Sequence, residues 1–136
     1  MLCFQQQPAD RERLPMGAPM ELVDAGTGPV LACARCRQHI TSTSARIAVG
    51  GHHEHTRENP HGFQFHIGCF ARALGCVAVS EPSLEWTWFP GYAWQIELCT
   101  GCAEHLGWRF ASSDHHFHGL ILDRLVELAE LTDAAS

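Results

Sequence analysis

The chain has 136 residues, of which 46% are hydrophobic, enough for one packed core and too few for two comfortable domains. Nine lysines and arginines face fifteen aspartates and glutamates, so the formal net charge is −6 and no basic stripe is present. Nucleic acid is therefore not an expected partner. The sequence has neither a signal peptide nor a run of about 20 apolar residues, so we expect a cytoplasmic protein without membrane association.

The first 28 residues are predicted to form a mobile leader, because prolines and glycines are scattered there among charged residues. Further along, short β-like runs alternate with turn residues, a rhythm typical of an all-β domain. The predicted strands cover residues 30–33, 45–49, 63–70, 77–79, 85–88, 94–99 and 108–111. We place the domain at residues 29–124 and a short C-terminal tail at residues 125–136.

Two segments allow a closer prediction. Apolar and polar residues alternate from Phe63 through Phe65 to Ile67, so these three side chains are expected in the core. The run 119–131 fits a helical stripe as well as a strand. We favour a last strand to about Leu122, followed by a short helical or frayed tail.

Two Cys-x-x-Cys pairs, Cys33 with Cys36 and Cys99 with Cys102, are the strongest chemical signal, and sixty-two residues separate them. Four thiolates on two tight turns are typical of structural Zn²⁺. A redox dithiol and an iron–sulfur cluster are the alternatives, and the redox reading is weaker because a thioredoxin-type motif needs one pair in a βαβ context. A closed Cys₄ site offers no position for water, so the metal is expected to hold the fold rather than catalyse hydrolysis.

The remaining cysteines and the histidines receive no catalytic role. Cys69 and Cys76 are expected to be small buried apolar residues, and Cys3 a thiol of the leader. Histidines crowd two stretches, with His52, His53, His55 and His61 in the first and His115, His116 and His118 in the second. A second metal site there is the less favoured expectation, because loop histidines are usually solvated.

All four tryptophans lie between residues 86 and 108, a span that contains the second cysteine pair. A Pro-Gly turn after Trp88 is predicted to bring Trp88 and Trp94 face to face, and the cysteine turn to fix Trp94 relative to Trp108. One tryptophan alone is most often a core residue, but this clustering favours a ligand-binding cage. Indole faces attract cations as well as neutral rings, and Glu85 is suited to serve a cation at the rim.

Several motifs resemble one known family. They are Trp-Phe-Pro-Gly-Tyr-Ala-Trp at 88–94, Cys-Thr-Gly-Cys at 99–102, His-Leu-Gly-Trp-Arg-Phe at 105–110 and Asn-Pro-His-Gly at 59–62. Together they resemble the thalidomide-binding C-terminal domain of cereblon, the CULT domain, and particularly its small bacterial single-domain homologues. The resemblance runs from about residue 33 to about residue 122. It implies a β-tent fold, in which two roughly orthogonal antiparallel sheets are pinned by a Cys₄ zinc site.

The resemblance also implies the site and its ligands. The implied site residues are the cage walls Trp88, Trp94 and Trp108, the floor Phe110, the loop residues Asn59, Pro60 and His61, the supporting Tyr92, and Glu85 with Trp86 on a strand whose backbone would bind the ligand. The implied ligands are cyclic imides, namely glutarimide and thalidomide-type rings and protein C-termini cyclised to an imide, with uridine-like rings as a weaker class. An imide suits a dry cage, because its N–H and carbonyls can pair with backbone groups while its CH₂ face rests on indoles.

Two departures from cereblon limit what is implied. Trp86 stands where vertebrate cereblon has histidine, which alters the rim of the cage and hence the ligand preference. The chain also lacks the Lon-like domain and the adaptor-binding helices through which cereblon joins a ubiquitin ligase. Ligand recognition is therefore expected, and a ubiquitin ligase adaptor is not.

Two alternative functions remain open. A methionine sulfoxide reductase B-like enzyme shares the fold and the zinc arrangement, but its nucleophilic cysteine lies well after the second pair, and here no cysteine follows Cys102. Thiol catalysis would need Cys69 or Cys76 instead. A methyl-ammonium reader would use the same cage for a cation. We expect a small-molecule binding module that is not an enzyme.

Overall fold

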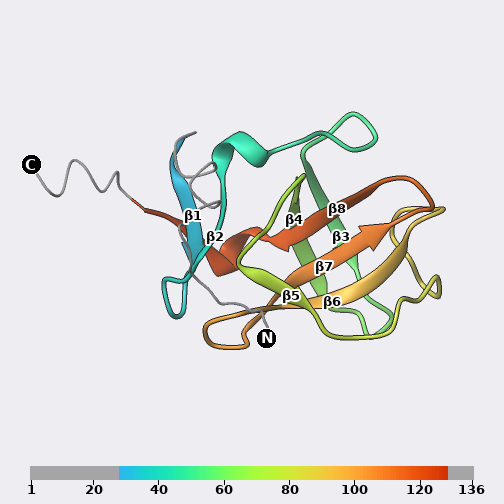
Figure 1. The fold of residues 1–136 in the computed structure, drawn as a ribbon. Coiled ribbons are helices and arrows are strands. Elements are labelled where there is room, and N and C mark those ends of the chain that lie inside the picture. The colour runs from blue at the N-terminus through green and yellow to red at the C-terminus, as the bar shows by residue number, and fades with distance from the viewer. Residues whose placement is uncertain (1–27, 129–136) are drawn as a thin grey trace, which may run out of the picture.

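The computed structural model describes residues 28–128, which form strands and two single-turn 3-10 helices (Figure 1). The elements are β1 Val30–Cys33, β2 His39–Ser42, η1 Thr43–Ala45, β3 Glu54–Glu58, β4 Gln64–Phe70, β5 Cys76–Ala78, β6 Ala93–Cys99, β7 His105–Ala111, β8 His116–Ile121, η2 Leu122–Arg124 and β9 Leu125–Glu127. The all-β prediction is confirmed. Within the described range, no helix is long and apolar enough to cross a membrane.

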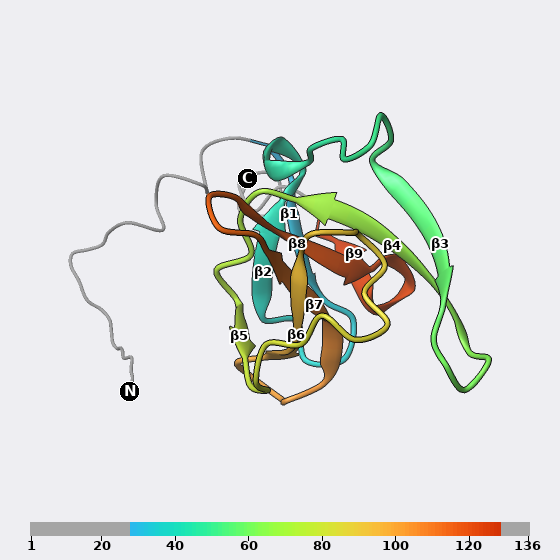
Figure 2. The ribbon, with the colours of Figure 1, turned by 90° about the vertical axis from the view of Figure 1, so that its right-hand side faces the viewer.

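The strands form two antiparallel sheets. The small sheet has the order β2-β1-β9, and the large sheet has the order β3-β4-β8-β7-β6-β5. In Figure 1, β1 and β2 of the small sheet stand beside the large sheet and run steeply to β6, β7 and β8, and Figure 2 shows β3 at the outer edge beside β4. Because η2 leads directly from β8 into β9, it connects the two sheets.

Two apolar clusters fill the interior. The first joins the sheets and contains Leu31, Cys33, Ile40, Ala45, Phe70, Ala73, Cys99, Leu106 and Leu120. The second lies in the large sheet and contains Ile67, Cys69, Phe89, Trp108, Phe110, Phe117 and Ile121. Full burial of each large apolar side chain contributes about 1.5–3 kcal/mol. The second cluster forms a rigid base for the site described below.

The alternating run around β4 is only partly buried. Ile67 is buried and Phe65 half-buried, but Phe63 is 65% exposed, so its assignment to the core is wrong. Phe63 precedes β4 and lies in the turn that joins β3 to β4. The alternation of buried and exposed side chains therefore begins at Phe65, two residues later than the sequence pattern suggested.

Two predicted strands are turns instead. Residues 45–49 contain the end of η1 and isolated bridges at Arg46 and Val49. Residues 85–88 form a turn in which Trp86 has a φ of 63°. Some apolar side chains of both segments contact the core or line the site, although the backbone is not extended into a strand. Their spacing in the sequence therefore resembles that of a half-buried strand.

The C-terminal boundary also differs from the prediction. The last long strand ends at Ile121, close to the expected Leu122. The next residues are not part of a tail, because β9 pairs with β1 through Leu125↔Cys33, Val126↔Ala32 and Glu127↔Leu31. The other residues of the predicted tail, 129–136, and residues 1–27 of the predicted leader lie outside the described range.

Candidate functional site

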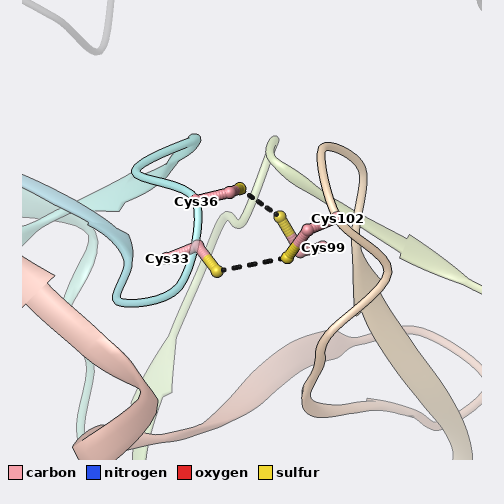
Figure 3. Close-up of side chains that lie close together, drawn as sticks. All are labelled: Cys33, Cys36, Cys99 and Cys102. Atoms are coloured by element: carbon pink, nitrogen blue, oxygen red, sulfur yellow. Dashed lines mark hydrogen bonds between the residues drawn. The ribbon is translucent and has the colours of Figure 1, made fainter.

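The four cysteines of the two Cys-x-x-Cys motifs converge between the sheets (Figure 3). Cys33 is the last residue of β1 and Cys36 lies in the turn that follows, while Cys99 is the last residue of β6 and Cys102 lies in the turn before β7. The Sγ atoms of Cys33 and Cys102 lie 3.7 Å apart, those of Cys36 and Cys99 lie 3.6 Å apart, and all four lie within 4.8 Å of one another. Sulfurs bound tetrahedrally at about 2.3 Å from one Zn²⁺ are separated by roughly 3.8 Å, so the set fits such an ion.

The two cysteine turns share one backbone geometry. The N–H of Arg37 donates to the carbonyl of Cys33 at 2.8 Å, and that of Ala103 to the carbonyl of Cys99 at 2.9 Å. The N–H of Cys33 donates to Gln38 at 2.9 Å, and that of Cys99 to Glu104 at 2.8 Å. Arg37 and Ala103 have left-handed φ values of 69° and 66°. Each turn thus presents its two sulfurs on one side.

The protonation of Cys99 is coupled to metal binding, because a metal ion would have to displace the thiol proton. Burial raises the pKa of the Cys99 thiol to about 12, so without a nearby cation it stays protonated at neutral pH. Across residues 28–128, these cysteines are the only converging group of three or more potential metal ligands. Within that range, no three ligand atoms from the two crowded histidine stretches converge.

A cavity of about 620 Å³ lies over the second apolar cluster. Its lining residues are Asn59, Pro60, His61, Phe65, Trp86, Trp88, Trp94, Ile96, His105, Trp108 and Phe110. This volume is within the range of sites for small organic ligands, and most of the lining is aromatic or aliphatic. The three expected wall residues, the expected floor and the expected loop all meet here.

The cage walls are held by edge-to-face packing and by hydrogen bonds. The ring centroids of Trp88 and Trp108 lie 4.8 Å apart with an interplanar angle of 71°. Trp88 is thus in direct ring contact with Trp108, and Trp94 lines the same cavity. The indole N–H of Trp88 donates to the carbonyl of Glu58 at 3.1 Å, and that of Trp94 to the carbonyl of Glu85 at 2.7 Å. These bonds fix both rings and leave their faces available.

The loop after β3 forms one side of the cavity. The side-chain oxygen of Asn59 accepts hydrogen bonds from the N–H groups of His61 and Phe63, each at 2.9 Å. Gly62 has a φ of 90°, a left-handed value that glycine adopts without strain. The Asn59 side chain therefore shapes the loop that carries Pro60 and His61 to the cavity.

Two of the expected site residues, Glu85 and Trp86, have roles other than those implied. Glu85 and Trp86 lie on a turn, and no strand forms there. Glu85 is exposed and contributes its carbonyl to Trp94, while Trp86 lines the rim with its side chain 67% exposed. Tyr92 was expected to support the cage, and it packs behind the floor without lining the cavity: its ring contacts Phe117, which stacks on Phe110, and its hydroxyl pairs with His115 Nδ1 at 2.9 Å.

Phe65, Ile96 and His105 line the cavity but were not predicted to. Strand alternation places Ile96 on the same face as Trp94, so that signal was available. His105 is half-buried, its Nε2 lies 3.1 Å from the carbonyl of Gly107, and its ring lies edge-on to Trp108 at 4.8 Å. Burial, aided by the charge of Arg124, lowers the pKa of His105.

In the described range, Cys69 and Cys76 are the two cysteines outside the Cys-x-x-Cys motifs. Cys69 is fully buried, and burial raises its pKa to about 11. Cys76 is half-buried and packs against the first cluster, and burial raises its pKa well above the usual range. Neither thiol has the low pKa of a catalytic nucleophile.

No family model matches the chain. Several curated proteins called "Protein cereblon" are similar to it. The protein of Drosophila melanogaster is 36% identical over 81 residues, covering 57% of this chain and 14% of that protein. The protein of Xenopus tropicalis is 41% identical over 54 residues, covering 40% of this chain and 12% of that protein. The protein of Danio rerio is 30% identical over 95 residues, covering 68% of this chain and 22% of that protein. The chain thus matches under a quarter of each relative, and the similarity indicates a cereblon-like domain.

Proposed function

We propose that this chain is a binding module for cyclic imides of the glutarimide and thalidomide type, including protein C-termini cyclised to an imide. The observation that carries the proposal is the cavity itself, where Trp88, Trp94 and Trp108 stand over Phe110. Because two of the indole N–H groups are bound to backbone carbonyls, the ring faces are oriented for a guest. The similarity to cereblon supports the same assignment.

The chemistry of an imide ring suits this cavity. Its CH₂ groups carry partial positive charge and rest well on indole faces, while its N–H and carbonyls require partners in the wall. In a site with few polar groups, each unmade hydrogen bond costs about 1–3 kcal/mol, which gives discrimination against rings without the N–H. The rim residue Trp86 is positioned to contact any substituent that extends from the ring.

The metal of the cysteine site is proposed to be structural Zn²⁺. The sulfur spacings of 3.6 and 3.7 Å and the all-thiolate donor set support this choice. When bound, Zn²⁺ would supply a charge that keeps the thiols ionised. Since four cysteines complete its shell, the chain's own contribution is to hold the two turns at the right separation.

We further propose that the module is not an enzyme. The raised pKa of Cys69 and its full burial argue against thiol chemistry of the methionine sulfoxide reductase type. A sulfoxide reduction assay is expected to be negative. Turnover of a methionine sulfoxide substrate would contradict this part of the proposal.

The binding proposal is tested by titrating the metal-loaded protein with glutarimide, followed by tryptophan fluorescence and calorimetry. Trp94→Ala is expected to weaken binding about 30-fold, roughly 2 kcal/mol, as for an aromatic anchor in an interface. Val77→Ala, an exposed site on β5 outside the cavity, is the control and should bind normally. The proposal would be contradicted if the parent protein gave no fluorescence or calorimetric response to glutarimide, or if Trp94→Ala bound glutarimide normally.

Two further ligands separate the ring chemistries. N-methylglutarimide keeps the shape of the ring but lacks the imide N–H, and it should bind much more weakly than glutarimide. A betaine-like quaternary amine tests the cation-reader alternative. If the amine binds and glutarimide does not, the site is a cation reader.

A further inference from the structure

Arg124 lies where the two cysteine turns meet the wall of the cage. It is the last residue of η2, and the strand that follows it pairs with β1 through Leu125↔Cys33. Its carbonyl oxygen accepts the N–H of Ala34 at 2.9 Å. Ala34 lies between the two cysteines of the first pair, so the main chain of Arg124 is bonded directly into that turn.

The side chain of Arg124 reaches the opposite turn. Its Nη1 donates to the carbonyl of His105 at 2.8 Å. His105 follows Glu104, whose carbonyl accepts the N–H of Cys99 and closes the second cysteine turn. One half-buried arginine therefore binds both turns, the first through its backbone and the second through its guanidinium.

The same guanidinium also contacts the cage. Its Cζ lies 6.0 Å from the centroid of the Phe65 ring. Phe65 is 5.2 Å from Trp108 and His105 is 4.8 Å from it, both edge to face. Trp108 thus contacts two residues that Arg124 also contacts.

We propose that Arg124 is a positioning residue that couples the cysteine metal site to the tryptophan cage. The spacing of the cysteine turns sets the position of the Trp108 wall through this side chain, and a guest in the cage acts back on the metal geometry. The two effects are reciprocal, as in any coupling between two sites. The ligand part of the inference rests on the proposed imide-binding function.

Arginine suits this role because its planar guanidinium can donate a hydrogen bond while it stacks on a ring. Lysine can replace the bond to His105 but offers no plane for Phe65. Arg124→Met removes both contacts and keeps most of the side-chain volume. The matched control is Arg109→Met, because Arg109 lies on the opposite face of β7 from Trp108 and donates to Gln95 at 3.3 Å.

The coupling is measured on folded protein loaded with ¹¹³Cd²⁺, whose NMR shift reports the geometry of its thiolate ligands. Glutarimide is expected to shift the ¹¹³Cd resonance in the parent protein and in Arg109→Met. In Arg124→Met the resonance should stay in place while glutarimide binds about fivefold or more weakly, with partial recovery in Arg124→Lys. A ¹¹³Cd shift in Arg124→Met equal to that of the parent would overturn the inference.

A second measurement needs no ligand. Exchange of Zn²⁺ for the larger Cd²⁺ is expected to change the near-UV circular dichroism of the indoles in the parent protein and in Arg109→Met, but not in Arg124→Met. An equal change in all three proteins would refute the coupling. If the parent shows this change and yet ignores glutarimide, the imide proposal fails while the role of Arg124 stands.

Discussion

The indole nitrogens of Trp88 and Trp94 show how single residues prepare the cage. Each N–H is satisfied by a backbone carbonyl, so each ring is anchored at one point and presents its face to the cavity. Trp108 is buried and lacks such a bond among the interactions of the described residues, so packing alone positions it. The wall with the fewest polar restraints is therefore the one that depends most on its neighbours.

The histidine beside that wall makes stability depend on pH. Burial first, then the positive charge of Arg124, lowers the pKa of His105 below its usual 6.5, while Glu104 opposes the shift. The unfolded chain then binds the proton more readily. Neutral His105 therefore makes its full contribution to the free energy of unfolding above about pH 6.5. This contribution is lost as the pH falls toward the pKa of His105 in the folded protein, because the unfolded chain takes up the proton first.

His105→Gln is expected to flatten the fall in unfolding free energy between pH 7.5 and pH 6.0, measured by urea titration of the metal-loaded protein. His116 also has a lowered pKa, although it is exposed, so His116→Gln is the comparison variant. Metal loss in acid affects all three proteins alike. The same pH slope in His105→Gln and the parent would contradict the assignment.

Cys69 provides a second test at the scale of one residue. Because burial raises its pKa to about 11, almost none of it is thiolate at pH 8. Iodoacetamide should therefore modify Cys69 far more slowly than a free cysteine, as followed by peptide mass spectrometry. Urea-unfolded protein is the control and should react at the ordinary rate. Rapid modification in the folded protein would show an exposed, reactive thiol.

Some site residues were predictable one by one and others were not. The metal ligands follow from two Cys-x-x-Cys pairs, because that spacing is itself the local geometry of the turn. His105 was missed because the β6–β7 register shifts between Glu97 and Leu98. Alternation counted back from Trp108 would place position 105 on the opposite face. Trp86 was misassigned because its left-handed backbone leaves no trace in a pattern of apolar residues.

At the scale of elements, the pairing of β7 with β8 builds the floor of the cage. Gly119 lies directly opposite Trp108. A Cβ atom at Gly119 would come within 2.9 Å of the Phe110 ring and 3.0 Å of Ile67. The missing side chain therefore leaves room for the Phe110 ring at the floor of the cavity.

Gly119→Ala is expected to lower the free energy of unfolding by about 1–3 kcal/mol, because it overpacks the floor. It should also weaken ligand binding by displacing Phe110. Urea unfolding and glutarimide titration measure the two effects. His116→Ala, on an exposed position of the same strand, should change neither by much. Unchanged stability in Gly119→Ala would mean that the floor relaxes freely.

The strands themselves were predictable where they are apolar. β1, β4, β6 and β7 follow runs of apolar residues that the core requires. β2, β3 and β9 were missed, and each is an edge strand in the described sheets. β3 reads Glu-His-Thr-Arg-Glu, a polar sequence that owes its strand conformation to pairing with β4. Pairing partners of this kind cannot be read from local periodicity.

At the scale of the whole molecule, the cysteine site joins the two sheets. One cysteine pair follows β1 of the small sheet, and the other lies between β6 and β7 of the large sheet. Besides this site, the sheets are held together by the first apolar cluster and by the η2 connection. Domains of this size are stable by only about 5–15 kcal/mol, a margin comparable to the binding free energy of a structural Zn²⁺.

Removal of the metal with a strong chelator is therefore expected to lower the thermal unfolding midpoint markedly or to unfold the domain. Circular dichroism with and without chelator measures the effect. Re-addition of Zn²⁺ should restore the midpoint, and Mg²⁺ should not, because thiolates bind it poorly. An unchanged midpoint in fully metal-free protein would show that the apolar cluster suffices to hold the sheets.

The repeated backbone geometry of the two cysteine turns bears on the order of assembly. Each turn is closed by hydrogen bonds that span at most five residues, whereas sixty-two residues separate the two pairs. Closing a short turn costs little conformational entropy and is fast, whereas bringing together segments that are distant in the sequence costs more entropy and is slow. Each Cys-x-x-Cys turn can thus form on its own. A metal ion bound early by the two sulfurs of one turn would then favour binding of the other two sulfurs.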